Sequence, residues 1–201
     1  MEGIELAKSE LIDGDFTCVV VQGKEVIMTS FNRGVKPLIQ FYDTQNNMQN
    51  DTINNTRNNT RNDTRNDTRN DIKNNMQNDT QNNARNYMQN DTESNTQNDM
   101  QNETKKSFFQ SPVLADKVIG RAAALLAVLC GITSIYTHII SEEALKVLDF
   151  YKIPVKYEKL VPYIINRSGD GRCPMEELSI GVNEPIEMYN KIVKWLAERE
   201  G

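Results

Sequence analysis

Hydrophobic and polar positions divide the chain into two stretches with regular patterns, separated by a long polar segment. In the first stretch, apolar residues at positions 4, 6, 7 and 11 have helical spacing and predict a short amphipathic helix over Ile4–Leu11. The β-branched run Phe16–Gln22 predicts a buried strand, and a polar turn leads from it to an antiparallel strand over Glu25–Ser30. A second helix is predicted over Leu38–Tyr42, because Pro37 suits the first turn of a helix.

The second stretch contains the longest apolar run of the chain. We predict one long central helix over Pro112–Leu129, ended by Gly131 as a C-terminal cap. A core strand over Ser134–Ile140 and a helix over Ser141–Tyr151 follow; the helix begins with a capping hydroxyl and two acidic residues. A further strand is predicted over Val155–Leu160. Strand, helix and strand in so short a segment predict a right-handed parallel crossover.

The last predicted helix begins at Pro185. Its apolar residues at helical spacing are expected to be buried: Ile186, Tyr189, Ile192, Val193 and Leu196. The predicted order is helix, strand, strand, helix, polar segment, helix, strand, helix, strand, loop and helix. This order predicts an α/β fold, namely a three-layer α/β/α sandwich with a mixed sheet.

The polar segment over residues 44–106 consists mainly of a tetrapeptide repeat. Fifteen consecutive units extend from Thr44 to Glu103, and Asn fills the third position in all of them but one. Asn, Thr and Asp are poor helix formers, and the repeat has no apolar face to offset the entropy lost on ordering. We therefore predict a disordered low-complexity insert, with a fluctuating helix as the main alternative. Residues 1–43 and 107–201 are predicted to form one core domain.

Charge and composition limit the classes of partner. The insert has eight basic and nine acidic residues, and the remainder of the chain has fifteen basic and nineteen acidic residues. This mild acidity argues against binding to a nucleic acid polymer. The chain starts without a basic and apolar leader, and the run Ala122–Ile132 is too short to cross a bilayer. We therefore expect a cytoplasmic protein without membrane attachment, whose three cysteines are reduced thiols.

Three polar clusters carry the candidate chemistry. One follows the second predicted strand, another lies near the predicted central helix, and the last is the polar loop before the terminal helix. Amide hydrogens at helix N-termini attract anions, and strand ends of α/β folds form binding sites. We therefore predict that the following residues bind a ligand: Arg33, Lys36, Asp116, Lys117, Arg121, Asn166, Arg167, Asp170, Cys173 and Glu176.

Each cluster also has a structural interpretation. Arg33 and Lys36 can be solvated turn residues, Asp116 a helix cap, and the loop from Asn166 a simple turn. Cys173 and Asp116 are weak candidates for catalysis, because a cysteine nucleophile needs a base. The only histidine, His138, lies within a predicted strand.

Several core segments resemble one family of prokaryotic proteins. They are Thr17–Val21, Arg33–Pro37, Ala115–Ala124, Val161–Arg167 and Gly169–Glu176. These motifs are similar to those of domain-of-unknown-function family 1893. The resemblance implies a cytidine-deaminase-like α/β/α fold, and it implies no established activity.

The sequence departs from the zinc-binding pattern of cytidine deaminases at two places. Those enzymes use His-x-Glu and Pro-Cys-x-x-Cys, whereas this chain has Asp116-Lys117-Val118 and Cys173-Pro174-Met175-Glu176. Zinc needs about three protein ligands, so we predict no zinc site and no other cofactor.

The favoured hypothesis is therefore a protein that binds a small anionic or nucleotide-like ligand, with or without catalysis. The alternatives are a divergent zinc-dependent hydrolase or deaminase, and a non-catalytic assembly or regulatory protein that forms a homo-oligomer.

Overall fold

The computed structural model describes residues 2–48, 50–51 and 111–200. By its contacts the chain forms two units, Met1–Thr44 with Phe108–Gly201, and Gln45–Ser107; the fold described below is that of the first unit. A helix begins at residue 36 and continues to residue 48, so the first residues of the predicted disordered insert are helical. The rest of that prediction lies outside the described residues.

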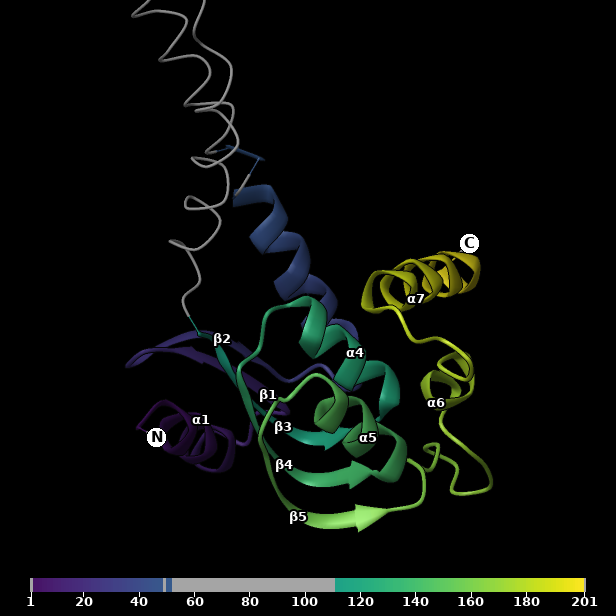
Figure 1. Cartoon of the computed structure of the whole chain (residues 1–201), viewed down its shortest axis with the longest axis horizontal. Coiled ribbons are helices and arrows are strands. Elements are labelled where there is room, and N and C mark those ends of the chain that lie inside the picture. Colours follow the sequence, from purple (N-terminus) through teal and green to yellow (C-terminus); the bar gives the residue numbers. More distant parts are fainter. Residues whose placement is uncertain (1, 49, 52–110, 201) are drawn as a thin grey trace, which may run out of the picture. The chain divides into compact units, whose positions relative to one another are not determined.

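A mixed five-stranded sheet forms the centre of the unit (Figure 1). Its strand order is β2-β1-β3-β4-β5, and the strands are β1 Cys18–Gln22, β2 Glu25–Ser30, β3 Val113–Ile119, β4 Ser134–Ser141 and β5 Val155–Val161. β1 pairs antiparallel with both β2 and β3, whereas β3 with β4 and β4 with β5 are parallel. The predicted α/β class, mixed sheet and parallel crossover are confirmed.

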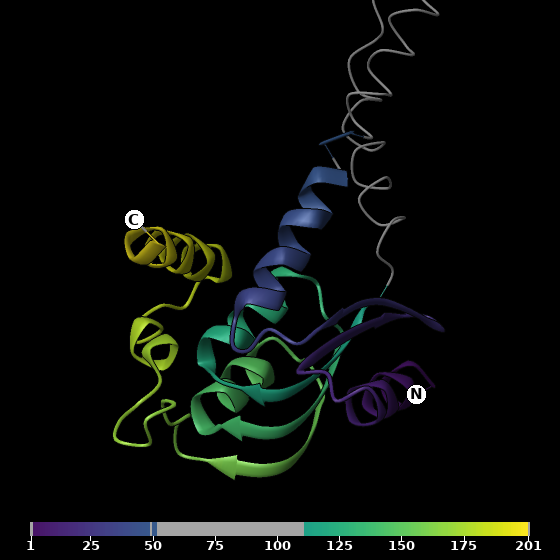
Figure 2. The ribbon, with the colours of Figure 1, turned by 180° about the vertical axis from the view of Figure 1, so that it is seen from behind.

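Helices cover the two faces of this sheet and make three layers. α1 (Glu2–Asp13) buries Ile4, Ala7 and Leu11 against one face, together with Val19, Ala115 and Tyr136 of the strands. α4 (Arg121–Leu129) and α5 (Glu142–Phe150) pack on the other face in the larger apolar cluster. Figure 2 shows the same layers from behind. α6 (Pro174–Leu178) and α7 (Pro185–Glu200) follow β5 in the sequence, and both contact α4.

The predicted single helix over Pro112–Leu129 is wrong in its first half. Val113–Ile119 forms strand β3, between β1 and β4, and only the alanine- and leucine-rich part forms helix α4. A fully buried strand and a buried helix have the same continuous apolar pattern, so periodicity does not separate them. Backbone hydrogen bonds to strands on both sides favour the extended conformation here. As a consequence, Asp116 and Lys117 lie in a strand and not at a helix start.

The prediction of which α7 residues are buried is only partly right. Ile192 is buried as predicted, but Ile186 and Val193 are 47% and 40% exposed, and Met188 is fully buried instead. Met188 and Ile192 are one helical turn apart and face the core, with Tyr189 and Leu196 partly buried beside them. Two local signals are confirmed. The Ser141 hydroxyl accepts a hydrogen bond from the Ala144 amide at 3.2 Å, and Gly131 adopts a left-handed φ of 69° after α4.

None of the helices in the described ranges combines the length and the apolar character needed to cross a membrane.

Candidate functional site

Four strands end at the same edge of the sheet. β2, β3, β4 and β5 run in one direction, since β1 is antiparallel to both of its neighbours. Each of the four is followed by a helix start: the helix from residue 36, then α4, α5 and α6. We call this side of the sheet the carboxyl edge. It is the side where α/β folds bind ligands, and most of the predicted site residues lie on the segments that follow these strand ends.

The start of α4 lies against a carboxylate from α6. Gly120 precedes α4 without a side-chain cap, and the buried Glu176 approaches it so closely that a Cβ atom on Gly120 would lie 2.8 Å from Oε1 of Glu176. The Ile164 amide donates a hydrogen bond to the same oxygen at 3.4 Å. The first turn of a helix favours negative charge. At the start of α4, the carboxyl group of Glu176 therefore occupies the place where the anionic group of a ligand would otherwise bind.

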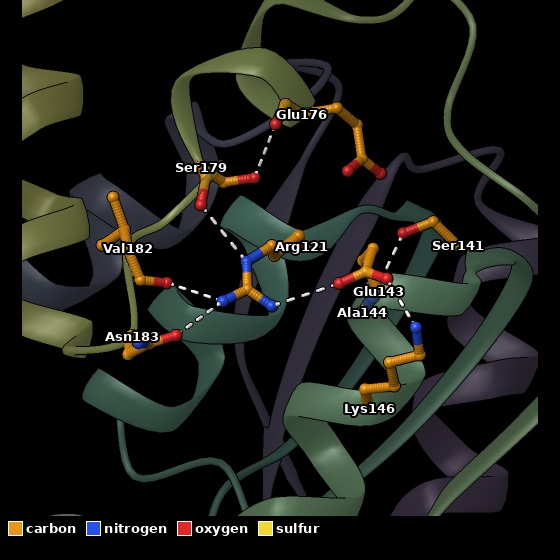
Figure 3. Close-up of polar contacts among 9 residues, drawn as sticks. All are labelled: Arg121, Ser141, Glu143, Ala144, Lys146, Glu176, Ser179, Val182 and Asn183. Carbon is orange, nitrogen blue, oxygen red and sulfur yellow. Dashed lines mark hydrogen bonds and ion pairs between the residues drawn. The ribbon is translucent and has the colours of Figure 1, made fainter.

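Arg121, the first residue of α4, is bound by neighbouring segments rather than directed at solvent (Figure 3). Its Nε donates to the Ser179 carbonyl at 3.2 Å, and Nη2 donates to the Val182 carbonyl at 2.7 Å and to Oδ1 of Asn183 at 3.1 Å. Nη1 lies 3.6 Å from Oε2 of Glu143 in α5. The side chain is 15% exposed. Arg121 thus clamps the start of α4 to the α6–α7 connection and to α5.

The loop over residues 162–173, between β5 and α6, is held in a defined turn by Asn166. Oδ1 of Asn166 accepts hydrogen bonds from the amides of Gly169 at 2.9 Å and Asp170 at 3.3 Å, and from the Ser168 hydroxyl at 3.3 Å. Its Nδ2 donates to Asp170 at 2.8 Å, and this bond is the main reason that the pKa of Asp170 is lowered. Asn166 and Asp170 are therefore brought together, and their visible role is to fold the loop.

Two arginines of this loop are exposed at the carboxyl edge. Arg167 makes no hydrogen bond or ion pair within the described residues. The guanidinium carbon of Arg172 lies 4.6 Å from the centre of the Tyr163 ring, and its positive charge contributes to the lowered pKa of Glu143. That pKa is lowered chiefly by the hydrogen bond from Lys146. Sequence reasoning did not select Arg172, although it lies within the polar cluster; its contact with Tyr163 depends on how the loop folds.

Cys173 precedes α6 and is half-buried. Its amide donates to the Ile164 carbonyl at 2.8 Å, and its thiol does not cap the helix. The centroid of the His138 ring lies 5.7 Å from that of the Tyr136 ring, and Tyr136 belongs to the apolar cluster that α1 covers. Within the described residues, His138 and Cys173 share no hydrogen bond.

Asp116 lies inside β3, paired with Cys18 of β1 and Thr137 of β4. Its Oδ1 accepts a hydrogen bond from the Val118 amide at 2.9 Å, and burial raises the pKa of its carboxyl to about 7. Burial, with Asp116 as the second cause, raises the pKa of the neighbouring Cys18 thiol. Asp116 is therefore a carboxyl group that changes its charge near neutral pH, set in the sheet and not in a helix cap.

Lys117 and Arg33 gather around Asp15, apart from the loop arginines. Nζ of Lys117 lies 2.5 Å from Oδ1 of Asp15 and donates to the Asp15 carbonyl at 3.3 Å. The pKa of Asp15 is lowered by the hydrogen bond from Lys117, and the charge of Arg33 adds to this effect. Lys36 is exposed in the first turn of the helix from residue 36.

Comparison with known proteins assigns the family. Residues 87–196, more than half of the chain, match the family model described as a domain of unknown function, DUF1893. The chain belongs to the DUF1893 family. The resemblance stated from the sequence is thus confirmed at the level of the family, while the cytidine-deaminase-like assignment stays a prediction.

A crystal structure of a DUF1893 family protein from Thermotoga maritima resembles this DUF1893 chain. The two are 16% identical, the likeness covers 96% of this chain and 89% of that one, and the TM-score is 0.59. At this identity the likeness extends to the fold. No curated protein matches the chain.

In this DUF1893 protein eight of the ten predicted site residues fall into two groups, whereas Asp116 lies inside β3 and Lys36 in the first turn of the helix from residue 36. Arg33 and Lys117 surround Asp15, and the second group occupies the 162–173 loop and the starts of α4 and α6: Arg121, Asn166, Arg167, Asp170, Cys173 and Glu176. Across the described parts of the chain, no three His, Cys, Asp or Glu side chains are grouped so that they could hold a metal ion. The absence of a cofactor stays a prediction.

Proposed function

We propose that this DUF1893 protein binds a small anionic or nucleotide-like ligand at the carboxyl edge, through the 162–173 loop. The observation that supports this proposal is the pair Arg167 and Arg172. Both guanidinium groups are exposed, and neither forms a hydrogen bond or a salt bridge within the described residues. Guanidinium groups bind carboxylate and phosphate through paired hydrogen bonds, which makes an anion the best-suited ligand.

Tyr163 makes the proposed site suitable for a ligand that carries an aromatic ring. Tyr163 is 40% exposed, and its ring lies under Arg172. An exposed tyrosine ring offers a stacking surface for a planar group, and an adjacent arginine neutralises a negative charge attached to that group. A nucleotide carries both features, so a nucleotide fits the pair better than an inorganic anion does.

The fold of the loop favours binding because contacts within the loop hold its backbone in a defined conformation. Asn166 fixes the turn, a β-bridge joins Ile165 to Arg172, and the amide of Cys173 is tied to the Ile164 carbonyl. A ligand that binds to a preformed loop loses less affinity to the ordering of side chains and backbone.

Arg121 and Glu176 have structural roles in this proposal. Arg121 already uses its donors on Ser179, Val182 and Asn183, and Glu176 is buried beside Gly120. The ligand-binding residues therefore belong to the loop between β5 and α6 and not to the helix starts.

The test is a ligand screen on the full chain by thermal unfolding and calorimetry, with inorganic phosphate, nucleosides, and nucleoside mono-, di- and triphosphates. A ligand at 100 times its Kd raises the free energy of unfolding by about 2.7 kcal/mol. We expect nucleotides to raise the free energy of unfolding of the wild type. Arg172→Ala and Arg167→Ala should each lower the affinity for the nucleotide by about ten- to a hundredfold.

Arg199→Ala is a matched control, because Arg199 also lies over an aromatic ring, that of Trp195 on α7, at 4.1 Å. It should leave the affinity unchanged. Absence of a nucleotide response, or equal losses in Arg172→Ala and Arg199→Ala, contradicts the proposal. A response that requires zinc and a nucleoside together would support the divergent deaminase instead.

A further inference from the structure

β5 forms one edge of the sheet, and its outer side is unpaired within the described residues. Residues 156–160 are all exposed, and the apolar side chains of Tyr157 and Leu160 are each 42% exposed. Proteins usually protect such an edge with a bulge, a proline, charged side chains or a covering segment. Of these, β5 carries charged side chains, namely Lys156, Glu158 and Lys159. β5 pairs with β4 in one constant register from Val155 to Val161, so no bulge interrupts the edge.

The direction of the backbone groups of β5 follows from one hydrogen bond. The amide of Ile135 in β4 donates to the carbonyl of Pro154 at 3.0 Å, so the Pro154 carbonyl points toward β4. The N–H and C=O of one strand residue point to the same side, and this side alternates along the strand. Lys156 and Glu158 therefore bond toward β4, whereas Tyr157 and Lys159 present their backbone groups at the free edge.

The charged side chains of β5 have a self-complementary order. Nζ of Lys156 lies 2.9 Å from Oε1 of Glu5 in α1, and Glu158 accepts a hydrogen bond from the hydroxyl of Tyr136 at 2.5 Å. Lys156 and Glu158 thus share the face of the sheet that α1 covers. They carry opposite charges at positions on either side of Tyr157.

We propose that β5 pairs antiparallel with β5 of a second copy of this chain, about a two-fold axis at Tyr157. In this register Lys156 of each copy lies opposite Glu158 of the other. These are non-hydrogen-bonded positions of the new ladder, where opposite side chains come closest. Two five-stranded sheets join into one continuous sheet, through an isologous contact.

The neighbouring registers are disfavoured by charge. A two-fold axis at Lys156, Glu158 or Lys159 places that residue opposite its own copy, and like charges directly opposite each other destabilise a strand pair. The contacts that Lys156 already makes do not prevent the pairing. A lysine ammonium has three donors, and Glu5 accepts from one of them.

The test is sedimentation equilibrium of the full chain over a range of protein concentrations, with wild type and charge-reversed variants. Lys156→Glu or Glu158→Lys alone converts both attractive pairs into like-charged pairs, and should raise the dimer Kd roughly tenfold. The double variant K156E/E158K restores opposite charges in reversed order, and should restore the wild-type Kd. Increasing salt should weaken the wild-type dimer.

A backbone variant tests the edge itself. Lys159→Pro removes an amide hydrogen at the free edge and none that bonds to β4, so it should abolish the dimer while the fold persists. Lys159→Ala is its matched control and should dimerise. Circular dichroism checks the fold of each variant; if Lys159→Pro unfolds, the charge-reversed set decides alone. A monomer at all concentrations, a dimer that a folded Lys159→Pro retains, or a double variant no better than the single ones overturns the proposal.

Discussion

Gly120 and Glu176 approach each other so closely that a side chain at position 120 would have to displace the Glu176 carboxylate. A Cβ atom there would lie 2.8 Å from Oε1 of Glu176 and 3.2 Å from Cγ1 of Ile164. The φ of Gly120 is −97°, which any residue adopts. The requirement for glycine is therefore steric, and it arises because α6 brings a buried carboxylate to the start of α4.

Gly120→Ala should lower the free energy of unfolding by about 1–3 kcal/mol, because an added methyl group must displace Glu176 or the backbone. The loss should be smaller in a background with Glu176→Ala, where the crowded carboxylate is gone. Urea unfolding of the wild type, the two single variants and the double variant measures the coupling, which we expect to be at least about 0.5 kcal/mol. Strict additivity of the two single effects would show that the residues do not interact.

Arg121→Ala should lower the free energy of unfolding by about 2–3 kcal/mol, because it leaves the Ser179 and Val182 carbonyls without their charged donor. Arg121→Lys should recover little of this loss, since an ammonium group does not reproduce the planar arrangement of the guanidinium donors. Lys146→Ala is the control: it removes an exposed partner of Glu143 and should leave the free energy of unfolding nearly unchanged. Full stability of Arg121→Lys would refute the clamp.

The raised pKa of Asp116 makes stability depend on pH. Its folded pKa of about 7 lies above the ordinary value of 3.8, so the folded state binds a proton more tightly than the unfolded chain does. The stabilisation from this group is complete below about pH 4 and is lost as the pH rises through 7, with an upper bound of about 4 kcal/mol.

Asp116→Asn isolates this effect, because its amide oxygen can still accept from the Val118 amide and it does not ionise. We expect the free energy of unfolding of the Asn variant, relative to wild type, to increase between pH 5 and pH 8. Urea unfolding of both proteins at several pH values measures this difference. Parallel pH profiles of the two proteins would mean that Asp116 does not titrate in this range.

Asn166→Ala should loosen the 162–173 loop while the sheet stays intact. The Asp170 amide loses its acceptor, so its hydrogen exchange should accelerate by about an order of magnitude. The Gly169 amide loses the side-chain acceptor but keeps the Asn166 carbonyl at 3.2 Å, so its exchange should change less. Exchange in β3 and β4 should be unchanged. Ser168→Ala removes one outer bond to the same acceptor and serves as the milder control. Unaltered exchange at Asp170 in Asn166→Ala would show that the backbone, and not the Asn166 side chain, holds the turn.

Sequence reasoning succeeded where local signals determine the structure. The hydroxyl at Ser141 and the glycine at 131 act within one turn of the chain, and the crossover from β4 to β5 is short enough for one pattern to define it. It failed at Val113–Ile119, because the strand is selected by its neighbours β1 and β4. An apolar run carries no information about those neighbours.

The proposed site lies in a region that the sequence also selected, but its residues differ from the predicted ones. The density of polar residues directed attention to the loop before α6, where Asn166 and Asp170 interact. The roles of Glu176 and Arg121 depend on contacts between distant segments, so composition and spacing did not reveal them. The same is true of Arg172, whose partner Tyr163 is brought close by the turn between them.

The contacts of Arg121 with residues 179–183 also determine the order in which parts of the domain fold during synthesis. Helix α4 leaves the ribosome well before residues 179–183, which supply three of the acceptors for its first side chain. Until they arrive, the guanidinium must remain in water, and the start of α4 stays incomplete although β3 and β4 can already pair. Closure of the domain by the α6–α7 segment is therefore a late step of vectorial folding.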